Sequence, residues 1–157
     1  MPASAGAKGR TNTPARAADL GLEMAQGADE ALFGWFLASY LFGKRISQSI
    51  AARTWAVIYR QHGCTSVAKL QRCSHGRLVS MLNEGHYSRY DESTAARLQE
   101  VCKVLQASCE GSLVTLAANC GSRAAFEQRV LALKGVGPKT LEIFMREAAA
   151  VLFPEQA

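Results

Sequence analysis

The chain has 157 residues, a formal net charge of +5 and a pI of about 9.1, with 48% hydrophobic and 20% charged residues. This length suits one domain with a substantial core, and the composition is ordinary for a globular protein. No apolar run reaches the roughly 18 residues that a transmembrane helix needs, so no membrane span is expected. The excess of positive charge favours a polyanionic partner.

Residues 1–27 are rich in Ala, Gly, Ser, Thr and Pro and carry few apolar side chains. Such a segment buries too little apolar surface to offset the entropy of ordering. We therefore expect a disordered N-terminal tail over residues 1–27 and a folded domain over residues 28–157. The tail has no apolar core of the kind found in a secretory signal.

Helical patterns follow one another through the rest of the chain. Residues 31–42 are apolar nearly all round, which predicts a helix buried among others. Later segments show apolar residues three and four apart, with candidate N-caps or starts at Ser47, Ser66, Ser74, Asp91, Ser112 and Ser122. Period-two alternation is absent. The sequence predicts an all-α domain of about eight helices joined by short loops.

Basic residues are unevenly distributed. No acidic residue occurs from Ala31 to Asn83, and the same stretch holds seven basic residues: Lys44, Arg45, Arg53, Arg60, Lys69, Arg72 and Arg77. This asymmetry favours nucleic acid as the partner, ahead of an anionic membrane surface or solubility alone.

The most informative stretch is 133–140, Leu-Lys-Gly-Val-Gly-Pro-Lys-Thr, which lies between two helical patterns. Gly135 and Gly137 can take positive φ and leave room for an approaching group. Pro138 suits the first turn of the following helix. That helix would begin with free N–H groups and the positive end of its dipole, so the turn is a candidate phosphate site.

Two other interpretations of this stretch were weighed. A nucleotide-binding P-loop is excluded because Pro138 stands where glycine is needed before the lysine, and no strand precedes the turn. An ordinary glycine-rich turn with a solvated lysine remains open.

The stretch resembles the helix-hairpin-helix motif of DNA-binding proteins, whose core reads apolar-x-Gly-apolar-Gly. More narrowly, it resembles the Leu-x-Gly-Val-Gly-x-Lys-Thr hairpin of the endonuclease III superfamily of DNA glycosylases. Two weaker similarities come earlier in the same order: residues 41–47 fall at that family's loop into its second helix, and Gly85-His86-Tyr87 resembles its Gly-x-Tyr turn. The resemblance covers residues 33–147.

The resemblance implies base excision repair, with Lys139 as the nucleophile of a DNA N-glycosylase and abasic-site lyase. It implies that DNA contacts come from the hairpin residues and from two other loops, and that Lys44 stands where relatives often have a glutamine that wedges into the gap left by a flipped base. The implied DNA-binding residues are Lys134, Gly135, Val136, Gly137, Lys139, Thr140, Lys44 and Arg45. Arg89 is added because it lies in a loop dense in aromatic and basic groups, where it can follow the DNA backbone. It also implies a monovalent cation on the backbone carbonyls of Leu131, Leu133 and Val136.

Two features of the family are absent from this sequence. No aspartate follows Asp91, so the family's catalytic aspartate is missing, and only Glu155 lies at a similar remove from the hairpin. The cysteines, Cys64, Cys73, Cys102, Cys109 and Cys120, lack the close spacing of an iron–sulfur site. A non-catalytic DNA-binding module and a fragment of a longer glycosylase therefore stay open.

The remaining expectations concern the protein's surroundings. We expect duplex DNA, in a damaged form, as the partner of a monomeric protein. We expect no cofactor other than the possible cation, no membrane partner, and an intracellular location in the bacterial cytoplasm or nucleoid.

Overall fold

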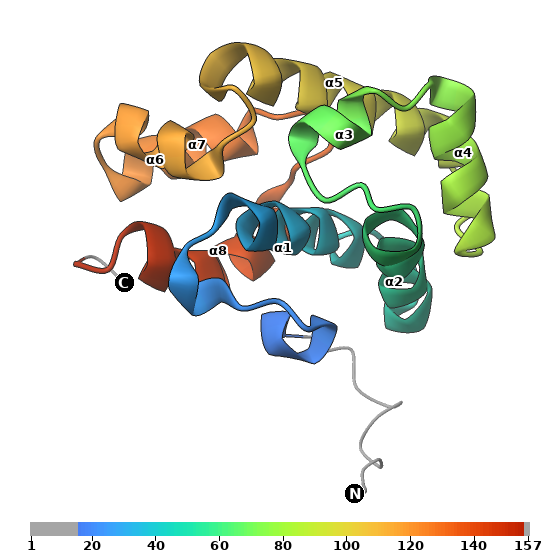
Figure 1. Cartoon of the computed structure of the whole chain (residues 1–157), viewed down its shortest axis with the longest axis horizontal. Helices are drawn as coiled ribbons and strands as arrows, with labels where there is room; N and C mark the ends of the chain where they lie inside the picture. The colour runs from blue at the N-terminus through green and yellow to red at the C-terminus, as the bar shows by residue number, and fades with distance from the viewer. Residues whose placement is uncertain (1–15, 156–157) are drawn as a thin grey trace, which may run out of the picture.

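The computed structural model describes residues 16–155, which form eight α-helices and no β-strand (Figure 1). The predicted all-α class is confirmed. The helices are α1 (Asp29–Phe42), α2 (Gln48–Trp55), α3 (Val67–Gln71), α4 (His75–Glu84), α5 (Asp91–Cys109), α6 (Leu113–Cys120), α7 (Arg123–Leu131) and α8 (Pro138–Leu152). Two 3₁₀ turns, Ala17–Leu20 and Met24–Gln26, precede α1, and a π-helical segment, Ala56–Gln61, continues α2.

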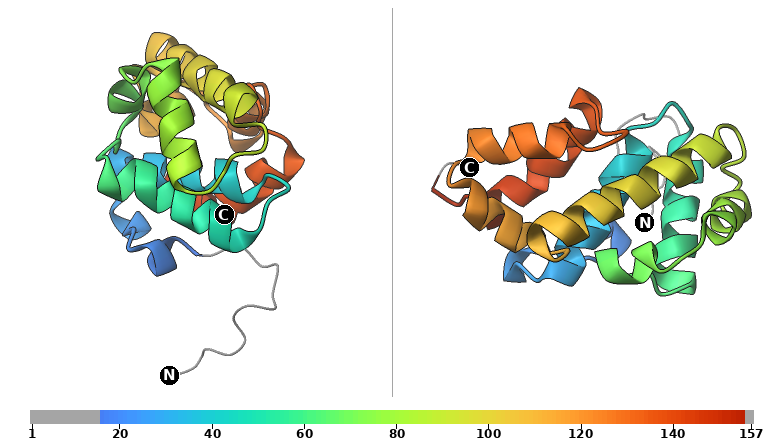
Figure 2. Two further views of the ribbon diagram at one scale, coloured as in Figure 1. Left: turned by 90° about the vertical axis from the view of Figure 1, so that its right-hand side faces the viewer. Right: turned by 90° about the horizontal axis from the view of Figure 1, so that it is seen from above.

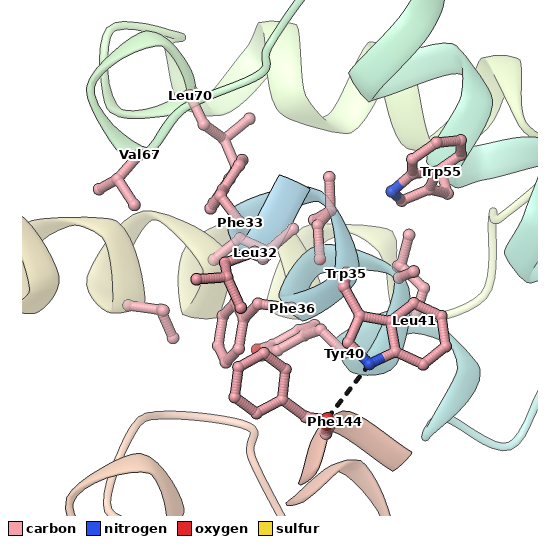
Figure 3. Close-up of a cluster of buried hydrophobic side chains, with 14 of the residues drawn as sticks. Leu32, Phe33, Trp35, Phe36, Tyr40, Leu41, Trp55, Val67, Leu70 and Phe144 are labelled. Carbon is pink, nitrogen blue, oxygen red and sulfur yellow. Dashed lines mark hydrogen bonds between the residues drawn. The ribbon is translucent and has the colours of Figure 1, made fainter. Parts of the chain in front are cut away.

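Helix α1 lies at the centre of the molecule, as its apolar sequence predicts. Every residue from Leu32 to Phe42 is buried, and α1 packs against both α2 and α8. Two indole N–H groups donate hydrogen bonds across these contacts. Trp35 Nε1 donates to the Phe144 carbonyl at 3.2 Å (Figure 3). Trp55 Nε1 donates to the Gly34 carbonyl at 2.8 Å. The donors therefore keep hydrogen-bond partners inside an apolar core.

A second group of helices covers α1 from the side opposite α8. The long helix α5 packs against α3 and α4, and α6 connects α5 with α7 (Figures 1 and 2). Within residues 16–155, no helix is both long and apolar enough to cross a lipid bilayer.

Serine caps set most helix starts. The side chains of Ser47, Ser66, Ser74, Ser112 and Ser122 each accept an N–H from the first turn of the following helix, as predicted. The prediction for α5 is wrong: Tyr90 is its N-cap, at φ 64°, and Asp91 is the first helical residue. The Asp91 carboxylate instead accepts N–H groups from Glu92 and from the Asn83 side chain.

The prediction of a disordered tail over residues 1–27 is wrong from residue 16 onward. Ala17, Leu22 and Met24 are buried against the core. Two hydrogen bonds fix this segment, from Arg60 to the Leu20 carbonyl at 2.8 Å and from the Ala17 N–H to Glu147 at 2.9 Å. The few apolar residues of this stretch are enough to order it, because distant elements of the fold supply their packing and hydrogen-bond partners. Residues 1–15 lie outside the described residues.

The α2–α4 contact depends on a glycine. Gly85 has φ −84° and ψ 3°, which any residue can adopt, but a Cβ there would overlap the side chain and Cα of Thr54. We expect Gly85→Ala to lower the free energy of unfolding by about 1–3 kcal/mol, because the two backbones would have to separate. Urea denaturation measures this change.

Gly76→Ala is the matched control, since a Cβ at Gly76, inside α4, meets nothing within 4 Å. This substitution should leave the free energy of unfolding unchanged or raise it by up to about 1 kcal/mol. Equal losses in the two variants would contradict the packing argument.

Candidate nucleic-acid interface

The hairpin between α7 and α8 has the backbone that its glycines and proline predict, with one difference. Gly135 takes φ 79°, whereas Gly137 is extended, with φ −111° and ψ −176°. Pro138 occupies the first turn of α8, and Gly137 is the N-cap, with no side-chain cap. The first N–H groups of α8 therefore face the hairpin without an intrahelical partner.

The end of α1 is fastened to this hairpin by two hydrogen bonds. The Tyr40 hydroxyl donates to the Lys134 carbonyl at 3.0 Å, and Lys44 Nζ donates to the Gly135 carbonyl at 2.9 Å. The Lys44 ammonium also lies 4.2 Å from the centroid of the Tyr40 ring. A Cβ on Gly135 would overlap the Tyr40 hydroxyl, so this close approach requires glycine.

The predicted hairpin residues divide into two groups. Lys134 and Lys139 are exposed, and Gly135 and Gly137 are partly exposed. Val136 and Thr140 are buried, and a Cβ on Gly43 would overlap the Thr140 hydroxyl. A DNA contact from Val136 or Thr140 would therefore come from the backbone.

Beside the hairpin is a cavity of about 560 Å³, which we call the cationic cavity. It lies between the α1–α2 loop, the α4–α5 loop and the first turns of α5, and these two loops and the hairpin lie along one edge of the molecule (Figure 2, right). Its nine lining residues include four cations and no carboxylate: Lys44, Arg45, Ile46, Tyr87, Arg89, Tyr90, Ser93, Thr94 and Arg97.

Three of these cations, Lys44, Arg45 and Arg89, were predicted from the sequence, and the structure brings them together. Arg97 was missed. The available signal was its position on the exposed face of α5, one turn after Ser93 and two turns after Tyr90. The sequence does not show that α5 lies beside the α1–α2 loop, because that is a property of the tertiary structure.

The α4–α5 loop presents an aromatic ring beside these charges. Tyr90 is 67% exposed, and the Arg89 guanidinium lies 5.3 Å from its ring centroid. His86 and Tyr90 both have positive φ, at 73° and 64°, which is uncommon for residues other than glycine. Tyr87 is buried beneath them, with its hydroxyl 2.8 Å from that of Thr94.

Burial alters the acid–base properties of the two residues that join α1 to the hairpin. Desolvation, followed by the positive charge of Arg97, lowers the pKa of Lys44 to about 8. Desolvation raises the pKa of Tyr40 well above its ordinary value, so its hydroxyl stays a donor to the Lys134 carbonyl. Lys44 therefore loses its proton far more readily than an ordinary lysine.

The basic run from Lys44 to Arg77 does not form one surface. Arg53 lies 3.1 Å from His86 near the cationic cavity, whereas Arg60 stacks over Trp55 and Tyr59 and contacts the N-terminal segment. Arg77 lies 3.4 Å from His62 Nδ1. Only the start of the run reaches the cavity.

The predicted monovalent cation stays a prediction. Among its three carbonyls, that of Leu133 accepts the Val136 N–H at 3.1 Å, which leaves it one lone pair. Over the described part of the chain, no three His, Cys, Asp or Glu side chains are grouped as a metal site would require.

Comparisons of the chain with protein-family models, with curated proteins and with solved structures found no match.

Gly135 and Gly137 differ in a way that stability measurements can separate. We expect Gly135→Ala to lower the free energy of unfolding by about 2 kcal/mol or more, from the left-handed backbone and the overlap with Tyr40. Gly137→Ala should cost less than about 1 kcal/mol, because its backbone is extended and nothing lies within 4 Å of a Cβ there.

Repeating Gly135→Ala in a Tyr40→Phe variant tests whether the Tyr40 hydroxyl causes the loss of stability. Removal of the hydroxyl should make Gly135→Ala less costly, which a double-mutant cycle in urea would show as a coupling energy. Strict additivity would mean that the Tyr40 hydroxyl is not what excludes a side chain at Gly135.

Proposed function

We propose that this protein binds damaged duplex DNA through the hairpin and the cationic cavity, and that it acts in base excision repair. The observation that carries the proposal is the joining of these two features by Lys44, which lines the cavity and donates to the hairpin carbonyl of Gly135. Backbone N–H groups at a helix start and clustered cations both favour phosphate oxygens.

The shape of the site supports DNA over a small anion. The hairpin and the two loops that line the cationic cavity lie along one edge of the molecule (Figure 2), so a continuous phosphate backbone can reach both. Tyr90 offers an exposed ring on which an unstacked base can lie. Its strained backbone indicates that the loop holds this ring at a defined place.

Within this proposal, glycosylase and lyase chemistry through a lysine nucleophile is the first hypothesis, and the hairpin motif indicates Lys139 for that role. Lys139 is exposed in the first turn of α8, next to the hairpin. Glu155 offers it little help, because α8 has 15 residues and is about 22 Å long, with Glu155 beyond its far end.

A non-catalytic DNA-binding module is the second candidate. It is favoured by one observation: none of the nine residues that line the cationic cavity is a carboxylate that would stabilise positive charge on a sugar.

The substitution Gly137→Val tests whether the hairpin contacts DNA phosphate. Because the glycine backbone is extended and has open space, the variant should fold, while its side chain would stand between the α8 N–H groups and a phosphate. We expect at least about a tenfold loss of affinity for a short duplex, equal for all sequences, since backbone contacts carry no base information. Fluorescence anisotropy measures this.

Gly76→Val is the matched control, as it also fills open space but lies in the first turn of α4, and no residue of α4 lines the cationic cavity. Unchanged affinity in Gly137→Val, or an equal loss in both variants, would contradict the hairpin contact.

The salt dependence of DNA affinity tests whether the cationic cavity binds phosphate. Arg45→Ala and Arg89→Ala should each reduce the slope of log affinity against log salt concentration by about one, because each removes one phosphate contact. Arg60→Ala should leave the slope unchanged, since Arg60 lies over Trp55 and contacts the N-terminal segment. Similar slopes in all three variants would exclude the cavity as the place where phosphate binds.

A further inference from the structure

The amine best placed for covalent chemistry in this structure is not the one that the hairpin motif indicates. Lys139 is exposed on the first turn of α8. Lys44 is half-buried where α1 meets the hairpin, and its side chain forms part of the wall of the cationic cavity. An amine nucleophile needs partial exclusion from water and a place beside its substrate. Lys44 is half-buried, and its side chain borders the cavity.

Fixed contacts hold the Lys44 side chain. Its ammonium donates to the Gly135 carbonyl at 2.9 Å and lies 4.2 Å above the Tyr40 ring. Both partners are themselves fixed, since the Tyr40 hydroxyl donates to the neighbouring Lys134 carbonyl. The amine is therefore positioned before any substrate arrives, which lowers the entropic cost of reaction.

Desolvation, followed by the positive charge of Arg97, favours the neutral form of Lys44. Arg45 lies on the same loop, Arg97 faces it from α5, and Arg89, Tyr87 and Tyr90 line the cavity from the α4–α5 loop. None of the cavity-lining groups is a carboxylate that would hold the proton on the amine. With a pKa of about 8, roughly a tenth of Lys44 is neutral at pH 7, against well under about one in a thousand for an ordinary lysine.

The same surroundings define the substrate class. The three arginines attract phosphate, so the electrophile that enters carries phosphate groups. A cavity of about 560 Å³ has the size of a site for one nucleotide-sized group. An abasic position in DNA meets these requirements, because its ring-opened sugar is an aldehyde flanked by two phosphates.

Resting on the proposed DNA binding, we propose that Lys44 is the catalytic nucleophile of the cationic cavity and forms an imine with the aldehyde of a ring-opened abasic sugar. The lone pair of the neutral amine attacks the aldehyde carbon, and the carbonyl π electrons move to oxygen. One proton passes from nitrogen to oxygen, and loss of water then gives the imine. No oxidant or reductant is needed.

Borohydride trapping tests this assignment. The full chain is incubated with a duplex that carries one abasic site, and borohydride reduces any imine to a stable amine. The variants are Lys44→Arg and Lys139→Arg, each of which keeps a positive charge and a donor but cannot form an imine. Affinity for a duplex with an unreactive abasic analogue is measured in parallel.

We expect an adduct with the wild type and with Lys139→Arg. With Lys44→Arg we expect at least about a tenfold lower yield for the same amount of bound duplex, as the parallel affinity measurement sets it. Peptide mapping of the wild-type adduct should place the sugar on Lys44, a readout that does not depend on how any variant folds. The trapping rate should rise with pH through about 8 and level off above it, as the amine loses its proton.

An adduct on Lys139, or an undiminished adduct in Lys44→Arg, overturns the assignment. Absence of any adduct while the wild type binds the analogue duplex also overturns it but leaves the proposed DNA binding intact. Failure to bind the duplex rejects the proposed function together with this inference.

Discussion

The contact between the end of α1 and the hairpin is the constraint on which the rest of the site depends. Tyr40 and Lys44 donate to two successive hairpin carbonyls, those of Lys134 and Gly135, and only a glycine at position 135 leaves room for the Tyr40 hydroxyl. Helix α1 is the most buried element of the fold, so the hairpin is attached to the core and not to another loop. Any ligand that meets the hairpin therefore meets a surface that is already in place, which reduces the ordering cost of binding.

The same contact explains how the hairpin and the cationic cavity come to lie next to each other. Lys44 follows the end of α1 by two residues. Its ammonium donates to the hairpin, and its side chain lines the cationic cavity. Arg97 and Arg89 arrive from α5 and the α4–α5 loop, which is pinned by the Tyr87–Thr94 contact. Four cations held together without a carboxylate repel one another, and a polyanion relieves that repulsion.

The sequence was most informative where local rules decide the structure. The five serine caps, the buried helix at 31–42 and the Gly-Pro start of α8 follow from propensity, spacing and backbone freedom, and the structure confirms them. Sequence reasoning failed where distant elements meet. Arg97 joins the cationic cavity only because α5 lies beside the α1–α2 loop, and Ala17, Leu22 and Met24 are ordered only because the core offers them partners. Lys44 was identified by its place in a loop, whereas its half-burial and lowered pKa come from tertiary packing.

Amide chemical-shift mapping with a short duplex that contains an abasic analogue would test the central claim most directly, because it locates the interface without any substitution. The account predicts that the largest shifts fall on Gly135, Gly137 and Lys139 in the hairpin and on Arg45, Arg89 and Arg97 around the cationic cavity. Shifts confined to other surfaces, such as Arg60 and the N-terminal segment that it contacts, or no shifts at all, would contradict it.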